Sequence, residues 1–249
     1  VAMKIGPTIP VATPSEGQYL APVELDHVLK PFRDIRDAVG GDIKIANDGH
    51  GKWSLPVAIQ IAKEMEKLDI MWQEDLMPLL NPHSLRQLQE ATTTPVCISE
   101  RLLTRWQFRE FIENGAAQIV MPDLIWTGGI TETHRIAIMA SAHQVPVAPH
   151  DATGPVNIFA CAQICMNSPN AMIMEHVRPY LYGWYGEMVD PLPPIENGWL
   201  HAPENPGIGT RLRPEVFDRP DVETRVTGVD AMIPGMSDEG WAGVGLYDP

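Results

Sequence analysis

Short apolar segments alternate with longer amphipathic segments along most of the chain. The apolar runs are IKIAND, LDIMWQED, PVCISE, AQIVMPD, VPVAPHD and AMIMEH. Between and before them apolar residues recur with helical spacing, which predicts helices over residues 23–39, 55–68, 84–91, 104–114, 130–143 and 155–166. Strands that are apolar throughout and separated by helices are typical of a parallel sheet covered on both faces.

A further apolar run, VAMKIG, opens the chain and adds a strand. The predicted strands then lie near residues 1–5, 43–47, 69–73, 96–99, 118–122, 145–149 and 171–174. A closed barrel of this kind needs eight strands. We therefore expect an α/β fold of the TIM-like (β/α)7β barrel type that lacks its first strand. An open doubly wound sheet is the alternative, but its first strand should lead into a Gly-rich phosphate loop, and VAMKIGPTIP contains none.

The character of the sequence changes after the last predicted strand. Residues 179–249 are rich in Pro, Gly and Trp and show little periodicity. We expect a barrel over residues 1–178 and a C-terminal extension over residues 179–249 that packs against it.

Composition excludes several classes of partner. The net charge of −14 leaves no basic surface for nucleic acid, and no run of eighteen apolar residues is present to span a membrane. The three cysteines, Cys97, Cys161 and Cys165, are an odd number in apolar surroundings. We interpret them as small buried hydrophobes, which fits a reducing cytoplasm.

Ionisable residues recur at the end of successive predicted strands. They are Asp48, Glu74, Glu100, Asp123, His150 and Glu175. The intervals between them are 26, 26, 23, 27 and 25 residues, which is about the length of one strand-and-helix unit. In a parallel barrel all strands point the same way, so these side chains should surround one mouth, where such folds keep their chemistry.

Three carboxylates on adjacent strands indicate a metal site. Asp48, Glu74 and Glu100 would repel one another unless a cation lay among them, and hard oxygen ligands suit Mg²⁺. The alternative is that each acid pairs with an ordinary Lys or Arg, but the matched spacing of all three favours the metal. His50 and His150 flank these acids and titrate near neutral pH, which suits proton transfer.

These residues lie in segments that resemble a known family. NDGHGKW, WQED, ISERLLTRWQF, MPDLIWTGGITETHRIAIMASAHQVPVAPHDATGPV and MEH resemble the barrel of the mandelate racemase and muconate lactonizing group of the enolase superfamily. Within that group they are most similar to D-galactonate dehydratase and related acid-sugar dehydratases. The resemblance covers about residues 43–176.

The resemblance implies a role for each strand-end residue. Asp48, Glu74 and Glu100 match the Mg²⁺ ligands of the family. His150 matches the base that removes the proton from carbon 2, and Asp123 matches its carboxylate partner. The remaining matches are His50, for the acid that assists departure of the carbon 3 hydroxyl, and Glu175, for the residue that hydrogen-bonds the enolate. The implied activity is Mg²⁺-dependent dehydration of a sugar acid to a 2-keto-3-deoxy acid, by a cytoplasmic homo-oligomeric enzyme.

Two positions depart from the family pattern. Lys4 matches the second lysine of the racemase Lys-x-Lys motif, whereas Ala2 replaces the first. Lys4 is thus a candidate catalytic residue, which either binds the substrate carboxylate or acts as a second base. Gln73-Glu74-Asp75 stands where relatives have Glu-Glu-Pro, and we expect Asp75 to be solvated.

The front of the chain differs most from the family. Relatives carry an N-terminal α+β capping domain that selects the substrate, and we expect it to be missing here or supplied by a partner chain. The C-terminal extension could pack on that cap. Two alternatives to dehydration remain: a racemase or epimerase of a 2-hydroxy acid on the same scaffold, and a non-catalytic family member.

Overall fold

The computed structural model describes residues 2–6 and 15–223. The chain divides into one compact unit of residues 1–211 and a second of residues 212–249. Within the second unit, the described residues contain a 3-10 helix, η1 (Pro214–Asp218). The first unit holds the candidate site. The expected barrel boundary between residues 178 and 179 stays a prediction.

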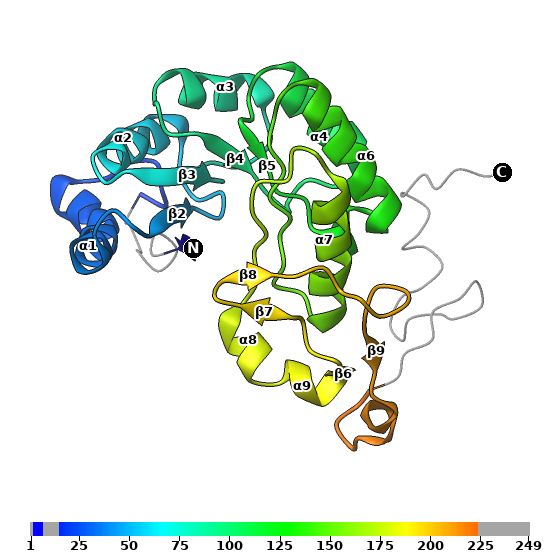
Figure 1. The fold of residues 1–249 in the computed structure, drawn as a ribbon. Helices are drawn as coiled ribbons and strands as arrows, with labels where there is room; N and C mark the ends of the chain where they lie inside the picture. The colour runs from blue at the N-terminus through cyan, green and yellow to red at the C-terminus, as the bar shows by residue number, and fades with distance from the viewer. Residues whose placement is uncertain (1, 7–14, 224–249) are drawn as a thin grey trace, which may run out of the picture. The chain divides into compact units, whose positions relative to one another are not determined.

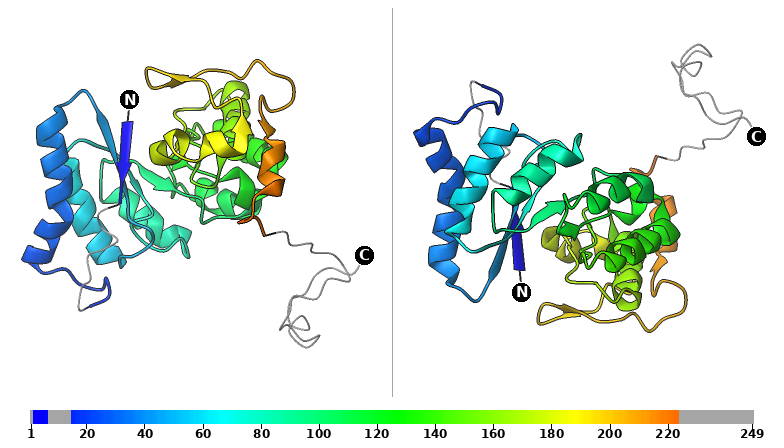
Figure 2. Two further views of the ribbon diagram at one scale, coloured as in Figure 1. Left: turned by 90° about the horizontal axis from the view of Figure 1, so that it is seen from below. Right: turned by 90° about the horizontal axis from the view of Figure 1, so that it is seen from above.

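The first unit begins with alternating strands and helices. The strands are β1 (Ala2–Ile5), β2 (Lys44–Asp48), β3 (Ile70–Glu74), β4 (Val96–Ile98) and β5 (Ile119–Val120). The helices between them are α1 (Pro22–Val39), α2 (Leu55–Glu66), α3 (Pro82–Glu90) and α4 (Thr104–Glu113). All five strands are parallel, in the order β1-β2-β3-β4-β5, and α1 and α2 lie next to one another on one side of this sheet (Figures 1 and 2). The predicted parallel α/β arrangement is confirmed over this region.

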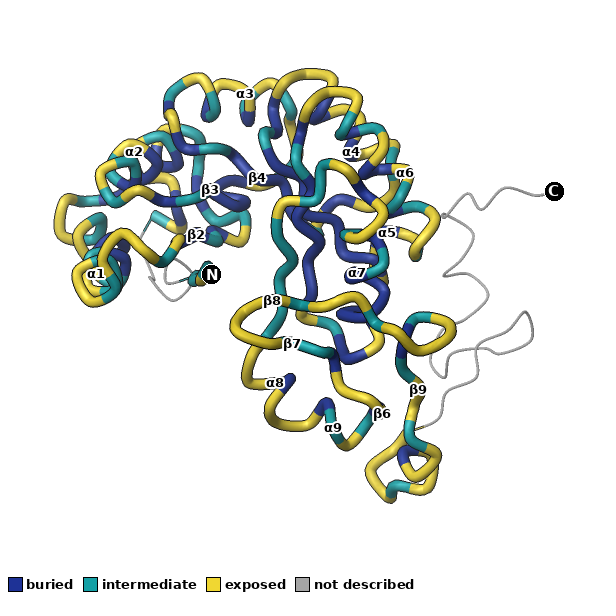
Figure 3. The backbone as a smooth tube through the Cα atoms, viewed as in Figure 1, coloured by how far each residue is buried: buried dark blue, intermediate teal, exposed yellow. Residues whose placement is uncertain are grey.

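Alternate strand residues are buried in two different hydrophobic clusters. Ile45, Ile98 and Val120 pack with the helices in the outer cluster, whereas their neighbours Ala46 and Cys97 belong to a separate inner cluster. Figure 3 shows the result: β4 is buried along its whole length, while α1 and α2 carry exposed turns. A sheet buried on both faces explains why its strands are apolar throughout.

The sheet continues past β5 without regular strands. α5 (Leu124–Thr127), α6 (Gly129–Ala142) and α7 (Pro155–Asn167) follow, and isolated parallel bridges join Val120 to Val147 and Val147 to Ala171. The sixth and seventh predicted strands therefore lie in the right place, but they are not continuous strands. Pro146 and Pro149 explain this for residues 145–149, because proline has no N–H to donate to a strand ladder.

The segment after residue 176 is more structured than its composition suggested. It forms α8 (Arg178–Tyr182), α9 (Tyr185–Met188) and the short strands β6 (Val189–Asp190), β7 (Ile195–Glu196), β8 (Trp199–Leu200) and β9 (Arg211–Leu212). Leu181 and Tyr185 are buried against Ile158 and Phe159 of α7. Residues 7–14, a Pro-rich part of the sequence, and residues 224–249 of the predicted C-terminal extension lie outside the described residues. No described helix has the length and apolar character needed to cross a membrane.

Candidate active site

The pairing of the first strands brings three predicted site residues together. Asp48 and Glu74 are register partners at the ends of β2 and β3. Lys4 on β1 is the register partner of Ala46 on β2, and the Ala46 side chain belongs to the inner cluster. The Lys4 side chain therefore lies on the same face of the sheet as the inner cluster. The spacing of Asp48 and Glu74 in the sequence thus corresponds to neighbouring positions on adjacent strands.

The ammonium group of Lys4 lies among three carboxylates. Its Nζ is 2.9 Å from Glu74 Oε1, 2.8 Å from Glu175 Oε1 and 3.6 Å from Asp48 Oδ2. Burial alone would lower the pKa of Lys4, but the charges of Glu74, Glu175 and Asp48 outweigh it and raise this pKa above its usual value. The lysine is therefore a firmly charged counter-ion in this arrangement.

Glu74 is the most enclosed of these acids. Its side chain is fully buried, and Oε2 accepts a hydrogen bond of 3.1 Å from the indole Nε1 of Trp72. Burial raises the pKa of Glu74 well above its usual value, and the Lys4 ammonium opposes that rise. A carboxylate in this position needs a cation beside it to stay ionised.

Glu100 lies in the turn after β4 and influences this region through its charge, which raises the pKa values of Asp75 and His150. Its place in the predicted metal site stays a prediction. Over residues 2–6 and 15–223, no three His, Cys, Asp or Glu side chains are grouped closely enough to hold a metal ion.

The chemistry of the donors nevertheless fits a divalent cation. Asp48 and Glu74 present carboxylate oxygens to one common cation, the Lys4 ammonium, and Glu100 comes from the next strand end. Hard oxygen donors of this kind suit Mg²⁺ better than softer transition metals. The residues fit the metal by type and by strand position, and the assignment of these three ligands stays a prediction.

His150 and Asp123 form a buried pair. An isolated parallel bridge joins their backbones, and His150 Nδ1 lies 2.7 Å from Asp123 Oδ2. Burial lowers the pKa of His150, but the hydrogen bond to Asp123 and the charges of Glu175 and Glu100 raise it more, so that it ends above its usual value. A carboxylate at Nδ1 also fixes the proton there and leaves the lone pair of the neutral ring on Nε2.

Asp123 has a second role at the start of α5. Its Oδ1 accepts hydrogen bonds from the backbone N–H groups of Ile125 at 2.8 Å and Trp126 at 3.3 Å. Two different oxygens of one carboxylate thus hold the helix and His150. The Trp126 ring lies 5.7 Å from the His150 ring, centroid to centroid.

Glu175 connects the two halves of the cluster. Oε1 pairs with Lys4, while Oε2 lies 3.7 Å from His150 Nε2. His150 Nε2 therefore faces the same carboxylate that contacts the Lys4 ammonium. This location is consistent with a role beside the reacting atoms, which stays a prediction.

His50 lies at the more exposed side of the same cluster. Its Nδ1 is 2.8 Å from Asp48 Oδ1, and its backbone N–H donates to the same oxygen at 3.1 Å. That backbone bond forms an Asx turn, and His50 adopts a left-handed φ of 50° within it. Its side chain remains 42% exposed, so the imidazole is accessible to solvent.

Three features of this region were not predicted from sequence: the burial of Asp75 and the positions of Trp126 and Asn157. Asp75 is 1% exposed, and its Oδ2 accepts from the Ser99 hydroxyl and lies 3.5 Å from Arg101 Nε. The interpretation of Asp75 as solvated was therefore wrong, because the chain turns inward after β3. Burial raises its pKa to about 7. Trp126 was also missed, although its place three residues after Asp123 could have indicated it.

Asn157 was missed as well, because an α7 residue gives no sign in sequence of which strand end it faces. Its Nδ2 lies 3.1 Å from Asp151 Oδ1, 3.3 Å from the His150 carbonyl and 3.5 Å from Asp123 Oδ2. The amide therefore supports the pair formed by Asp123 and His150 from the helix behind it.

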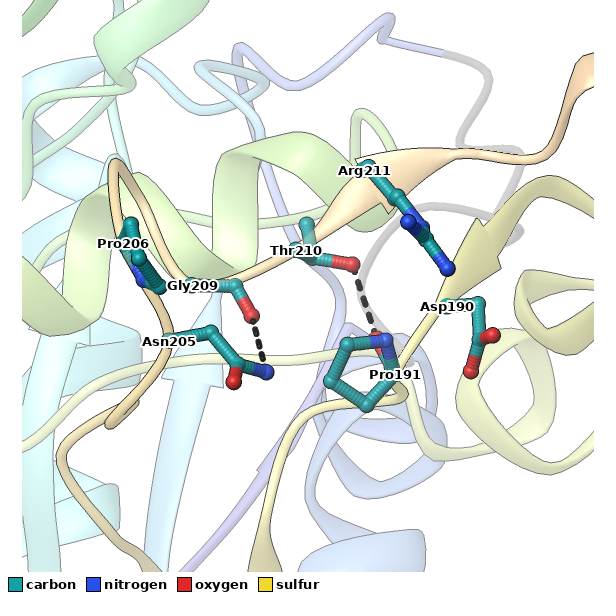
Figure 4. A pocket seen from close by; sticks show the side chains of 7 residues that line it. All are labelled: Asp190, Pro191, Asn205, Pro206, Gly209, Thr210 and Arg211. Carbon is teal, nitrogen blue, oxygen red and sulfur yellow. Dashed lines mark hydrogen bonds between the residues drawn. The ribbon is translucent and has the colours of Figure 1, made fainter.

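A separate cavity of about 410 Å³ lies in the segment after α9, and none of its lining residues is a predicted site residue. Figure 4 shows the lining, which is Asp190, Pro191, Asn205, Pro206, Gly209, Thr210 and Arg211. The Thr210 hydroxyl donates to the Pro191 carbonyl at 2.8 Å, which links the two chain segments around the cavity.

The family model and similar curated proteins indicate the same relationship. Residues 1–216 match the model of the enolase C-terminal domain-like family. The chain is 32% identical over 195 residues to a protein named D-xylonate dehydratase from Haloferax volcanii, a match covering 78% of this chain and 47% of that protein. It is 31% identical over 193 residues to a D-galactonate dehydratase from Ralstonia pickettii, covering 76% and 50%.

Solved structures show the same relationship. An enolase of the mandelate racemase subgroup from Agrobacterium tumefaciens superposes with a TM-score of 0.81 at 39% identity, covering 87% of this chain and 59% of that one. An enolase protein from Sargasso Sea environmental sequencing superposes with a TM-score of 0.83 at 36% identity, covering 88% and 59%. The chain spans about half the length of the curated relatives that it matches.

Proposed function

We propose that this chain, which belongs to the enolase C-terminal domain-like family, is the catalytic part of a Mg²⁺-dependent acid-sugar dehydratase. The enolase superfamily relationship and relatives named as dehydratases indicate an enzyme, of the lyase type. The substrate class, the metal and the residue roles are our proposal. The observation that carries it is the pair of His150 and Asp123 beside Glu175, in the same cluster as Asp48 and Glu74.

His150 is suited to act as the base. Asp123 holds its Nδ1, so Nε2 is free to take the proton from carbon 2 of a sugar acid. The raised pKa of His150 makes it a stronger base than an isolated imidazole. Such a carbon acid is nevertheless weak, and the negative charge that forms on the substrate needs stabilisation.

Asp48, Glu74 and Glu100 are the residues that would hold a divalent metal for this purpose. When bound, Mg²⁺ would supply positive charge to the substrate carboxylate and so make the adjacent carbon more acidic. It would also mask the field of a chain with a net charge of −14, which otherwise repels an anionic substrate.

His50 is suited to act as the acid. Its Nδ1 contacts Asp48, and its half-exposed ring can present a proton to the hydroxyl on carbon 3. The bond from carbon 3 to oxygen breaks as that proton is transferred, and water leaves. Carbon 2 and carbon 3 are then joined by a double bond, and the enol tautomerises to a 2-keto-3-deoxy acid. Glu175 lies beside His150, and in its protonated form it would donate a hydrogen bond to the negative charge that develops on the substrate.

Racemisation is not favoured as an alternative. It would require Lys4 to act as a neutral base on the face of the substrate opposite His150, yet its ammonium contacts three carboxylates. A non-catalytic role explains neither the Asp123–His150 pair nor the His50 turn. We further propose that a capping segment or partner chain completes the site, in a cytoplasmic homo-oligomer.

The direct test is a screen of sugar acids, D-xylonate and D-galactonate included, with Mg²⁺ in D₂O. We expect a 2-keto acid product, detected by semicarbazide and by NMR. His150→Asn and His50→Asn should each abolish it, whereas the matched surface variant His143→Asn should not. Deuterium exchange with inversion and no keto acid would show racemisation instead. Absence of both product and exchange across the screen would contradict the proposed activity.

A further inference from the structure

Lys4 lies where a metal ion would have to approach Asp48 and Glu74. Its Nζ contacts both carboxylates, at 3.6 and 2.9 Å, and the lysine side chain is only 16% exposed. A divalent cation on the same oxygens would stand within a few ångströms of the ammonium. Because like charges at such distances repel each other inside a protein, the ammonium and a metal ion would compete for these two acids.

Lys4 has an alternative ion-pair partner in Glu175. Glu175 Oε1 is 2.8 Å from Nζ, and Glu175 is not among the proposed metal ligands. The lysine can therefore give up Asp48 and Glu74 and keep one full ion pair. Met121 Sδ, 3.9 Å from Nζ, lines the same interior space with a neutral, polarisable group.

From these contacts we infer that Lys4 is a built-in counter-ion that competes with the divalent metal for Asp48 and Glu74. It neutralises the acids while no metal is bound, and it moves onto Glu175 when the metal arrives. This inference rests on the proposed metal site, but it concerns metal affinity and metal-free stability and not the reaction. It makes Lys4 a positioning residue whose removal should tighten metal binding.

The test uses the full chain and Mn²⁺ as the probe, with free Mn²⁺ measured by EPR and Mg²⁺ binding by calorimetry. Lys4→Met keeps most of the side-chain length and removes the charge, and it should bind Mn²⁺ at least about tenfold more tightly than the natural chain. Lys4→Arg keeps the charge and should bind with the natural affinity. Lys30→Met removes an exposed lysine paired with Asp34 and should also leave the affinity unchanged.

Stability without metal gives a second readout. In EDTA, Lys4→Met leaves the buried Glu74 without its cation, and its Tm should fall by several degrees, whereas Mn²⁺ should restore it. If this variant does not fold in EDTA, it can be refolded with Mn²⁺, and the affinity measured by chelator competition.

The outcomes separate this inference from the proposed function. The competition is supported if Lys4→Met binds Mn²⁺ more tightly than the natural chain while the other two variants do not. It is also supported if Lys4→Met binds Mn²⁺ and the natural chain does not. Equal or weaker binding by Lys4→Met, with Mn²⁺ bound by the natural chain, overturns the competition and leaves the proposed metal site intact. Absence of binding in every variant overturns both.

Discussion

At the residue scale, Asp123 has two separate tasks that one substitution can distinguish. In Asp123→Asn the amide oxygen can still accept from Ile125 and Trp126, so α5 should remain folded. The carboxylate that favours the protonated ring is lost, so the pKa of His150 should fall, and the acid limb of kcat/KM should move to lower pH. We also expect kcat to fall about 10- to 100-fold, as for other supporting carboxylates. An unchanged His150 titration by NMR would contradict this role.

Asp151 provides a residue-scale prediction about stability. Its side chain is fully buried, and its pKa is raised to about 7 because burial disfavours the charged form. The native state therefore holds this proton more tightly than the unfolded state, whose carboxyl titrates near pH 3.8. The penalty of ionisation is complete above about pH 7, and it disappears as the pH falls below the unfolded pKa.

The change Asp151→Asn should accordingly stabilise the protein at alkaline pH. The amide can still accept the hydrogen bond from Asn157 Nδ2, and it carries no charge to bury. We expect the free energy of unfolding to rise by about 1–3 kcal/mol at pH 8 and by little at pH 4. Urea unfolding at both pH values measures the difference. A variant equally destabilised at both would show that the charge is not the issue.

Residue identities in the site were predictable only in part. The strand-end spacing indicated that Asp48, Glu74, Asp123 and His150 lie near one another, because register follows from repeat length. It could not indicate that the Asp75 side chain turns inward. The first residue after a strand no longer follows the alternation of the strand, so its side chain can be either buried or exposed. The contact between Lys4 and Glu175, 171 positions apart in the chain, depends on side-chain direction and was likewise not predictable.

At the element scale, the loop after β2 packs against the segment after β3 backbone to backbone. The Gly49 N–H donates to the Glu74 carbonyl at 2.8 Å, and the Gly51 N–H donates to the Asp75 carbonyl at 2.6 Å. A Cβ on Gly49 would lie 2.7 Å from the Leu76 Cα and 2.9 Å from the Asp75 carbonyl oxygen. Only glycine allows this approach.

Gly49→Ala should therefore force the two strand ends apart. We expect a loss of about 1–3 kcal/mol in the free energy of unfolding, with weaker Mn²⁺ binding, because Asp48 and Glu74 separate. Gly41→Ala is the matched control, since a Cβ there meets nothing within 4 Å, and it should be close to neutral. Equal stability of both variants would contradict the close packing of these loops.

The elements themselves were largely predictable. Each main helix was placed within about two residues of its observed ends, since apolar spacing and terminal prolines such as Pro22 and Pro155 mark them. Strand continuity was not, because hydrophobicity marks a buried segment whether or not its backbone forms a regular ladder. Pro146 and Pro149 were visible in the sequence and should have reduced the expected regularity of residues 145–149.

At the scale of the compact unit of residues 1–211, the Lys4–Glu175 ion pair joins β1 to the segment that follows Ala171, the last residue in a parallel bridge. Among the described strands, β1 hydrogen-bonds only to β2 and lies at the end of the strand order β1-β2-β3-β4-β5. Edge strands open more readily than central ones unless a side chain holds them. The ion pair of Lys4 with Glu175 ties β1 in this way to a residue far along the sequence.

Glu175→Gln should therefore loosen β1 specifically. Lys4 would keep its ion pairs with Glu74 and Asp48, so β1 should stay folded. The ion pair between Lys4 and residue 175 would be lost, because glutamine carries no charge. We expect amide hydrogen exchange in residues 2–5 to accelerate several-fold, while β4, buried at every residue, should exchange as before. The exposed variant Glu204→Gln should leave both strands unchanged. Uniform acceleration across the sheet would instead mean that Glu175 supports global stability, and unchanged exchange in β1 would mean that pairing with β2 alone is enough to hold it.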